Sequence, residues 1–284
     1  MLNAGGTVRE LLSEGTTALR TAGVDSPGLE SEILLREALD ATRVQLFDML
    51  PYPVRPHAAT AFRELIERRV NGEPIAYITG RRDFYEQTFV VNRHVLVPRP
   101  ESECLVERAL EWLRGHEPGP HRVVDIGTGS GAIAISIACA SDNRHQVVAS
   151  DLSRDALRVA RQNRTALDAN VHLVCGDLLG WYRGEADVVV ANLPYLRPDQ
   201  RHAGIEHEPE IALYAGDDGF DLNRRLLEQA SVILQRPGLL VMEIDPDQRD
   251  VAIATAQRWF QNDSNEIVRD LAGVDRYLVI QRAS

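Results

Sequence analysis

Residues 122–140 decide the fold, and they read RVVDIGTGSGAIAISIACA. The stretch is an apolar run, a turn with three glycines and a second apolar run, which predicts a buried strand, a sharp turn and a helix. The same alternation recurs as far as residue 280, so we expect an α/β domain with a mostly parallel sheet and helices on both faces. The strands are expected at 122–126, 146–150, 171–174, 186–190, 238–242 and 277–280, and the helices at 132–140, 153–166 and 226–234.

The segment before this domain has a different pattern. Apolar residues recur at helical spacing, with two proline-containing breaks, and they predict a small helical bundle over residues 1–75 that serves packing or contact with a partner. Alternating apolar residues from Phe84 to Val91 predict a β-hairpin within a linker over residues 76–98. The α/β domain is expected over residues 99–284.

The composition narrows the possible functions. The chain has 284 residues, of which 44% are hydrophobic and 26% are charged, values typical of a globular protein. The formal net charge is −11, and because binding to a nucleic-acid backbone depends on excess cations, this charge argues against direct nucleic-acid binding. All 31 basic residues are arginine, which excludes a Schiff-base lysine and a phosphate-loop lysine.

The cysteines and the apolar segments bear on metals and on location. The three cysteines are far apart without a C-x-x-C pair, which argues against a zinc site and suits a reducing cytoplasm, so no metal is expected. The first residues lack the basic patch and apolar run of a targeting peptide. The longest uncharged stretch, 126–141, is too short and too rich in glycine to span a membrane. We expect a cytoplasmic protein that does not bind membranes.

Four predicted strands end in a polar residue, namely Asp125, Asp151, Asp177 and Asn192. In open parallel sheets, ligands bind outside the carboxyl ends of the strands. One polar residue at a strand end could be a surface cap, but four at successive strand ends are expected to converge on one crevice.

The glycine turn indicates the kind of ligand. Glycine permits the sharp turn and the close approach of a ligand, and the helix behind the turn favours negative charge. Asp125, two positions before the first glycine, suits a cofactor with a sulfonium and an ammonium group, whereas it would repel a pyrophosphate. Asp151 is then placed to accept hydrogen bonds from a ribose diol, and Asp177 to lie near the edge of an adenine.

The segment Asn192-Leu193-Pro194-Tyr195 indicates the kind of substrate. No cysteine, lysine or Ser–His pair accompanies it. An asparagine oxygen beside an exposed backbone carbonyl can accept both N–H bonds of a planar NH2 group, which aligns the nitrogen and stabilises the positive charge that it gains. Tyr195 can offer an apolar face to the same group.

Six groups of residues occur together in one order: Gly72–Gly80 (GEPIAYITG), Val97–Glu103 (VPRPESE), Asp125–Gly131 (DIGTGSG), Asn192–Tyr195 (NLPY), Glu208-Pro209 with Ala212-Leu213 and Gly216–Gly219 (GDDG), and Gly273–Arg276 (GVDR). In this respect the whole chain resembles the peptide-chain release factor glutamine N5-methyltransferases, the family often called PrmC or HemK. The first two segments are specific to that family, whereas many methyltransferases share the glycine turn.

The resemblance implies a Rossmann-like class I methyltransferase domain with a mostly parallel seven-stranded sheet, preceded by a small helical bundle domain. It implies S-adenosylmethionine as the cofactor and class I peptide-chain release factors as the protein partners. The implied reaction methylates the side-chain amide nitrogen of the glutamine in their Gly-Gly-Gln motif.

The resemblance also implies roles for individual residues. The expected cofactor-binding residues are Gly127, Thr128, Gly129, Ser130 and Gly131 at the methionine part, Asp151 at the ribose, Asp177 and Leu178 at the adenine, and Asn192. The expected substrate-binding residues are Asn192, Leu193, Pro194 and Tyr195, of which Asn192, Pro194 and Tyr195 are the expected catalytic residues. The family usually has proline at position 193 and often a large aromatic residue at position 178, so Leu193 and Leu178 depart from its pattern.

Three alternatives remain from the residues alone. A nucleic-acid amino-methyltransferase acting on adenine N6 of ribosomal RNA or DNA would use the Asn-Leu-Pro-Tyr segment for a similar NH2 group, although the acidic balance argues against it. An NAD-dependent oxidoreductase could use the glycine turn. A non-catalytic module could bind S-adenosylmethionine without turnover.

Overall fold

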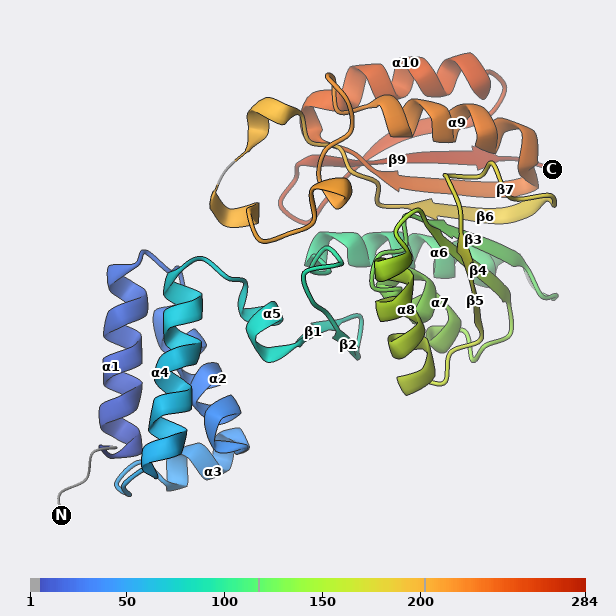
Figure 1. Cartoon of the computed structure of the whole chain (residues 1–284). Coiled ribbons are helices and arrows are strands. Elements are labelled where there is room, and N and C mark those ends of the chain that lie inside the picture. The colour runs from blue at the N-terminus through green and yellow to red at the C-terminus, as the bar shows by residue number, and fades with distance from the viewer. Residues whose placement is uncertain (1–5, 117, 202) are drawn as a thin grey trace. The chain divides into compact units, whose positions relative to one another are not determined.

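The computed structural model describes residues 6–116, 118–201 and 203–284. The contacts within it divide the chain into two units, Met1–Gly80 and Arg81–Ser284 (Figure 1). Each unit has a hydrophobic core of its own, formed by residues of that unit alone.

The N-terminal unit is a bundle of helices, as the sequence predicts. Its helices are α1 (Val8–Thr21), α2 (Pro27–Leu39), α3 (Arg43–Asp48), α4 (Pro56–Val70) and α5 (Ile75–Thr79). Helix α1 approaches its neighbours closely at Gly15, where an added Cβ would lie 2.6 Å from both the Phe62 ring and the Ser31 hydroxyl. Glycine is therefore required at this position for packing.

The second unit begins with an antiparallel hairpin of β1 (Arg81–Phe84) and β2 (Gln87–Val90). Tyr85 and Glu86 form the two-residue turn with φ values of +46° and +62°. Positive φ at both central residues gives the turn a twist that matches the twist of the strands. The Tyr85 N–H donates to the Glu103 carboxylate, which holds the turn against the start of the next helix.

The rest of the second unit is built on a seven-stranded sheet in the order β5-β4-β3-β6-β7-β9-β8. Its strands are β3 (Arg122–Ile126), β4 (Gln146–Asp151), β5 (Val171–Cys175), β6 (Ala186–Ala191), β7 (Leu234–Glu243), β8 (Ser264–Arg269) and β9 (Asp275–Arg282). The first five strands in this order pair in parallel, and β9 and β8 complete the sheet as antiparallel strands. The predicted mostly parallel seven-stranded fold is thus confirmed.

Helices cover both faces of the sheet (Figure 1). The five long helices are α6 (Glu103–Gly115), α7 (Ala132–Ala140), α8 (Arg154–Ala166), α9 (Asp221–Ile233) and α10 (Arg249–Trp259). Neighbouring residues of β3 point to opposite layers, because side chains alternate along a strand. Val123 packs in the core with α6 and α7, and Val124 packs in the core with α9 and α10.

Some of these elements were not predicted from the sequence. Strand β8 contains only two large apolar residues, Ile267 and Val268, because it is an edge strand that pairs with β9 alone. Its pattern therefore lacks the apolar run that marks the inner strands. Helices α6 and α10 were also missed, and their polar outer faces obscure the buried stripe.

The strand order reverses direction between β3 and β6. Strands β4 and β5 continue the sheet on one side of β3, whereas β6 and β7 continue it on the other side. The connections that leave β3 and β6 therefore diverge to opposite faces, and such a switch point opens a crevice at the carboxyl ends of the strands.

Asn163 of α8 ties three segments together beside this crevice. Its side chain is buried, and its oxygen accepts the Val90 N–H at 2.7 Å. Its nitrogen donates to the carbonyls of Val90 at 2.9 Å and of Ser130 at 2.8 Å. The hairpin, α8 and the glycine turn thus share the hydrogen bonds of a single side chain.

We expect Asn163→Ala to lower the free energy of unfolding by about 2–4 kcal/mol, because it leaves buried backbone groups of Val90 and Ser130 without these partners. Urea unfolding followed by circular dichroism measures the change. Gln162→Ala, at the exposed neighbouring position of α8, is the matched control and should change stability by less than about 0.5 kcal/mol. Equal stability of the two variants would contradict the role of Asn163.

Candidate active site

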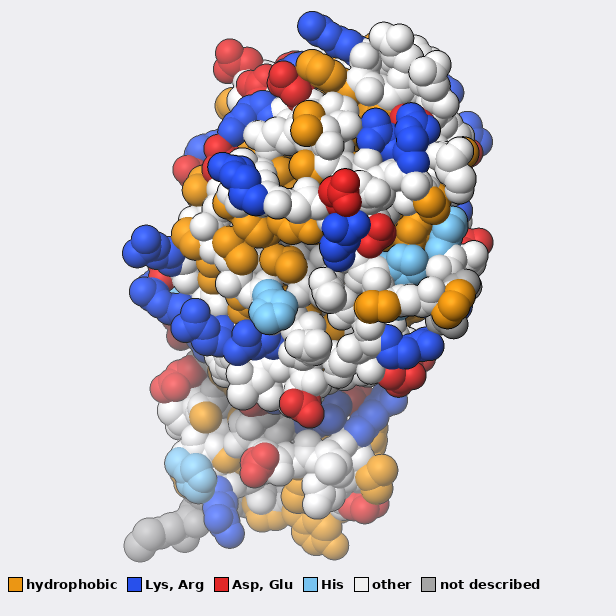
Figure 2. Space-filling view, turned by 90° about the vertical axis from the view of Figure 1, so that its right-hand side faces the viewer, with side chains coloured by type: hydrophobic (Ala, Val, Ile, Leu, Met, Phe, Trp, Pro, Cys, Tyr) orange, Lys and Arg blue, Asp and Glu red, His pale blue; other side chains and the backbone are white. Residues whose placement is uncertain are grey.

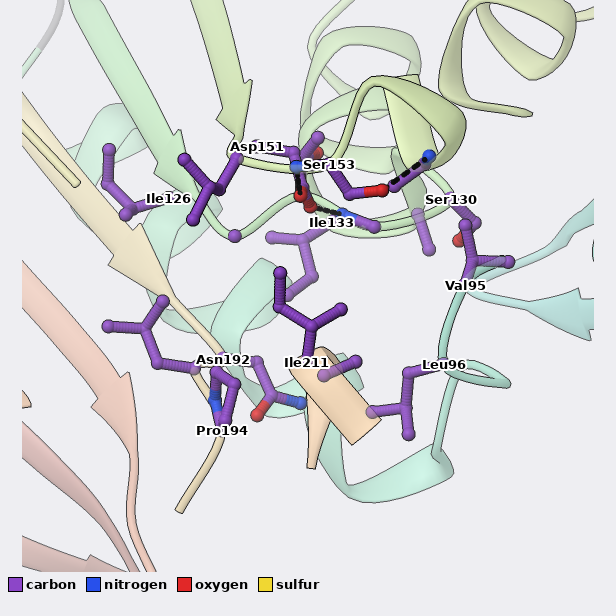
Figure 3. Close-up of a pocket in the computed structure, with 18 of the residues that line it drawn as sticks. Val95, Leu96, Ile126, Ser130, Ile133, Asp151, Ser153, Asn192, Pro194 and Ile211 are labelled. Carbon is purple, nitrogen blue, oxygen red and sulfur yellow. Dashed lines mark hydrogen bonds between the residues drawn. The ribbon is translucent and has the colours of Figure 1, made fainter. Parts of the chain in front are cut away.

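A pocket lies at the carboxyl ends of β3, β4 and β6, within the second unit (Figure 3). The predicted site residues that line it are Gly127, Thr128, Gly129, Ser130, Asp151, Asp177, Leu178, Asn192, Leu193 and Pro194. Gly131 and Tyr195 are not among the residues that line it.

The glycine turn connects β3 to α7 along one wall. Gly127, Gly129 and Gly131 have φ values of +73°, +55° and +83°, a region that other residues adopt only with strain. An added Cβ at Gly129 would meet nothing within 4 Å, whereas one at Gly131 would lie 2.7 Å from the Ile135 side chain. Gly129 thus leaves open space beside the turn, and Gly131 lets it pack against α7.

Asp151 ends β4 beside the glycine turn. One oxygen of its carboxylate accepts the Gly129 N–H at 2.9 Å, and the other accepts the Ser153 N–H at 2.8 Å (Figure 3). Burial raises the pKa of Asp151, and these backbone N–H groups oppose the rise. Each oxygen keeps a lone pair, so the fixed carboxylate can accept two further hydrogen bonds from a diol.

Asp125 corrects the sequence analysis. The sequence predicts that this carboxylate faces the ligand, but the side chain is fully buried and does not line the pocket. It accepts a hydrogen bond from the Thr128 hydroxyl at 2.6 Å, so it braces the turn from the side of the core. Because burial outweighs this hydrogen bond, the pKa of Asp125 rises to about 7.

Asp177 and Leu178 follow β5 at the far end of the pocket. The Asp177 carboxylate pairs with Arg225 of α9 at 2.5 Å in an exposed position. Leu178 is buried with a φ of +47°, and its carbonyl accepts the indole N–H of Trp181 at 2.7 Å. Leu178 also lines the pocket, and its side chain forms part of the apolar wall.

Asn192 and the residues after it form the wall that continues from β6. The Asn192 side-chain nitrogen donates to the Ser102 hydroxyl at 2.7 Å, which leaves the amide oxygen as the end that can accept hydrogen bonds. The Tyr195 hydroxyl donates to the Glu243 carboxylate at 3.2 Å. Burial and the nearby Glu243 charge hold the pKa of Tyr195 far above its usual range, so the phenol stays protonated.

The charges in the pocket suit a cofactor with a ribose. Asp151 and Asp177 are the acidic residues that line it, while Arg99 and His94 are the basic ones, and neither basic residue lies in the glycine turn. The Asp151 carboxylate can accept hydrogen bonds from a ribose diol, a contact that S-adenosylmethionine shares with NAD. The residues present therefore fit S-adenosylmethionine.

Residues 10–80 match the PrmC N-terminal domain, and residues 109–209 match the methyltransferase small domain. The chain is 39% identical to the release factor glutamine methyltransferase of Moorella thermoacetica, over 97% of this chain and 99% of that protein. It is 35% identical to the protein of the same name from Deinococcus radiodurans, again over 97% and 99% of the two chains. The chain belongs to the release factor glutamine methyltransferase family.

Solved structures show the fold alone. A Pyrococcus furiosus methyltransferase matches with a TM-score of 0.52 and 18% identity, covering 77% of this chain and 98% of that one. A T. thermophilus 16S rRNA N2 G1207 methyltransferase in complex with AdoMet and guanosine matches with a TM-score of 0.51 and 16% identity, covering 71% and 49%. The release factor glutamine methyltransferase family is an enzyme family that uses S-adenosylmethionine, and this chain has its fold.

The pocket of this release factor glutamine methyltransferase also has a wall that sequence reasoning did not assign. Residues 94–102 and the segment after β6 supply lining groups, among them Leu96, Arg99, Ser102 and Ile211 (Figure 3). The Pro-Arg-Pro segment and the pairs Glu208-Pro209 and Ala212-Leu213 contribute to the resemblance without a predicted role, and they are the available signals for this wall. No sequence pattern marked Leu96 or Ile211.

An ion pair holds that wall together. The Glu208 side chain is 1% exposed, and its carboxylate accepts from Arg99 at 2.6 Å and from the Val97 N–H at 3.3 Å. An arginine beside a carboxylate that is also hydrogen-bonded to the backbone gives a defined geometry. The loop that contains Ile211 is thereby fixed to the segment before α6.

We expect Asp151→Ala to weaken S-adenosylmethionine binding about a hundredfold or more, because hydrogen bonds to a charged acceptor are worth roughly 1.5–3 kcal/mol each. Isothermal titration calorimetry measures the affinity. Glu111→Gln removes an acidic charge from α6 outside the pocket and should leave the affinity within about twofold. Unchanged affinity of the Asp151 variant would remove this residue from the cofactor site.

Asp125 gives a pH dependence of stability with a defined sign. Its folded-state pKa of about 7 lies above the ordinary aspartate value of 3.8, so the unfolded chain ionises first and stability falls as pH rises between these values. Between pH 5 and pH 7 the parent should lose about 2 kcal/mol more than Asp125→Asn, which lacks this titration. Urea unfolding of both proteins at the two pH values measures the difference. Parallel curves would show that Asp125 is ionised in the folded protein.

Proposed function

We infer that this enzyme transfers a methyl group from S-adenosylmethionine to the side-chain amide nitrogen (N5) of the glutamine in the Gly-Gly-Gln motif of class I peptide-chain release factors. The observation that carries the inference is the orientation of Asn192 in the pocket. Its side-chain nitrogen donates to Ser102, and its oxygen can accept a hydrogen bond from a substrate. The names of the relatives with 35–39% identity support the same substrate.

Different residues of the pocket bind the cofactor and the substrate. Asp151 and the turn from Gly127 to Gly131 hold the cofactor, which supplies a methyl group activated by a sulfonium. The backbone and side chains at Asp177 and Leu178 border its adenine. Asn192 stands between the two ligands, because it ends the strand next to the one that leads into the glycine turn.

The chemistry of the substrate explains why an acceptor is needed. An amide nitrogen is a weak nucleophile, since its lone pair is delocalised into the carbonyl. The bound cofactor would supply the methyl group from its sulfonium, with the bonding electrons left on sulfur, and the amide nitrogen that takes the methyl group would lose one proton to water. The Asn192 oxygen and the Leu193 carbonyl, as acceptors of the two N–H bonds, align the nitrogen and stabilise its developing positive charge. Pro194 keeps the preceding residue extended, which presents that carbonyl.

Tyr195 has a different place from the one the sequence suggests. Its hydroxyl is bonded to Glu243, its carbonyl accepts from Gln248 at 3.0 Å, and it does not line the pocket. We propose that it supports the segment from behind and meets the substrate through one edge of its ring at most.

The N-terminal part of the chain is proposed to dock the protein substrate, with residues 1–75 as the docking domain, 76–98 as a linker and 99–284 as the catalytic domain. Because release factors act in translation, we propose that the enzyme works in the cytoplasm. None of the described helices has the length and apolar character needed to cross a membrane.

A nucleic-acid substrate is the second candidate, because adenine also presents a planar NH2 group. The net charge of −11 opposes it, since phosphate backbones bind to excess cations. On the face drawn in Figure 2, arginine side chains occur in several groups with acidic side chains between them. The charge distribution therefore favours the protein substrate.

Incubating a class I release factor with the full chain and S-adenosylmethionine should add one methyl group to the glutamine of its Gly-Gly-Gln peptide, as read by mass spectrometry. We expect Asn192→Ala to lower kcat about a hundredfold, roughly 2.7 kcal/mol, with little change in cofactor affinity. Methylation of ribosomal RNA in place of the release factor would overturn the inference.

A further inference from the structure

A chain of hydrogen bonds lies behind Asn192 and connects three distant segments. The Asn192 nitrogen donates to the Ser102 hydroxyl at 2.7 Å, and the Ser102 hydroxyl donates to the Glu243 carboxylate at 2.9 Å. The Tyr195 hydroxyl donates to the other oxygen of Glu243 at 3.2 Å. Ser102 ends the short 3-10 helix Pro100–Ser102, and Glu243 ends β7.

The two side chains in the middle of this chain of hydrogen bonds, Ser102 and Glu243, are shielded from water. Ser102 is 3% exposed and Glu243 is 2% exposed. A buried carboxylate is costly unless several groups stabilise its charge. Glu243 has two hydroxyl donors and the positive charge of Arg276 nearby, while Glu101 opposes them with its negative charge. The pKa of Glu243 is raised, because burial outweighs the hydrogen bonds from Ser102 and Tyr195 and the charge of Arg276, which lower it.

The chain has a direction that Glu243 sets. The Ser102 hydroxyl has a single proton, and it donates this proton to an oxygen of Glu243. Toward Asn192, Ser102 can then offer only a lone pair. Asn192 must therefore direct its NH2 group toward Ser102, because its oxygen would face another acceptor there. The oxygen of Asn192 is thereby the end that remains for a ligand in the pocket.

The opposite orientation of Asn192 would be unproductive. It would present an NH2 group to the NH2 group of the substrate, and two donors cannot form a hydrogen bond. The two ends of an asparagine amide have the same shape, so packing alone does not choose between them. A polar partner with a fixed direction is needed to make the choice.

We propose that Glu243, acting through Ser102, is a positioning residue for methyl transfer that fixes which end of the Asn192 amide faces the substrate. The proposal rests on the proposed function, since it requires a substrate that donates N–H bonds. Glu243 touches neither substrate nor cofactor in this scheme. It also gives the Pro-Arg-Pro-Glu-Ser segment a role, because this segment carries Ser102 to the end of β6.

The first test measures the orientation without activity. The Asn192 side-chain NH2 signal is identified in the NMR spectrum of the full chain by its disappearance in Asn192→Ala, and its exchange with solvent is measured. We expect slow exchange in the parent and exchange at least about tenfold faster in Ser102→Ala and Glu243→Gln. Ser102→Ala removes the acceptor of the Asn192 NH2 group, and Glu243→Gln allows the Ser102 hydroxyl to reverse its direction. Fast exchange in the parent would overturn the proposal, whatever the substrate of the enzyme.

The second test measures turnover on the release factor. Ser102→Ala and Glu243→Gln should each lower kcat about tenfold with cofactor affinity within about twofold, and Ser102→Thr should restore kcat to within about threefold. Ser136→Ala is the matched control, because Ser136 is a buried serine of α7 whose hydroxyl has no partner in the described structure. It should leave kcat unchanged.

The third test separates positioning from general support of the fold. In an Asn192→Ala background, Ser102→Ala should cost less than about twofold, because a residue that acts through Asn192 has nothing left to orient. An equal cost in both backgrounds would show that Ser102 and Glu243 act on the structure at large, and it would overturn the proposal. If Glu243→Gln does not fold, the Ser102 variants decide the question. An active parent without this coupling refutes the positioning role alone, whereas an inactive parent refutes the proposed function.

Discussion

Strands β3 and β6 are parallel neighbours whose chains leave the sheet toward opposite faces, and the site depends on this divergence. After β3 the glycine turn leads into α7, which packs in the core of one face. After β6 the chain runs through Asn192 and a long loop to α9, which packs in the core of the other face. The space between the two connections cannot be closed by either of them, so a pocket with two chemically different walls results.

The sequence predicts the inner part of this arrangement well and its edges poorly. The runs at 122–126 and 186–190 are apolar because these strands are buried on both faces, and the structure has strands there. The polar ends Asp151 and Asn192 do reach the same pocket. Strand β8, by contrast, is an edge strand with a mostly polar sequence, and nothing in its pattern distinguishes it from a loop.

Contacts between distant side chains are the part that sequence reasoning could not supply. The position of Asp125 two residues before a glycine predicts a ligand contact, but the alternation of side chains along β3 turns it into the core, where Thr128 meets it. The neighbours of Asn192 come from positions 102 and 243, and no local pattern joins them.

The packing of Leu193 is another contact between distant segments. Its side chain is buried, and it lies so close to Gly127 that a Cβ added to this glycine would be 2.8 Å from it. The Leu193 side chain fills the room that the glycine leaves.

The hydrogen bonds around Ser102 also constrain when the site can form during synthesis. Ser102 is separated by 90 residues from Asn192 and by 141 residues from Glu243. A nascent chain that has reached the glycine turn, or even Asn192, still lacks the carboxylate that orients the asparagine. Contacts of such long range form late, once the intervening chain is available to pack. The cofactor-binding wall can therefore assemble on the ribosome before the substrate-binding wall is complete, and the orientation of Asn192 is fixed only when β7 takes its place beside β6.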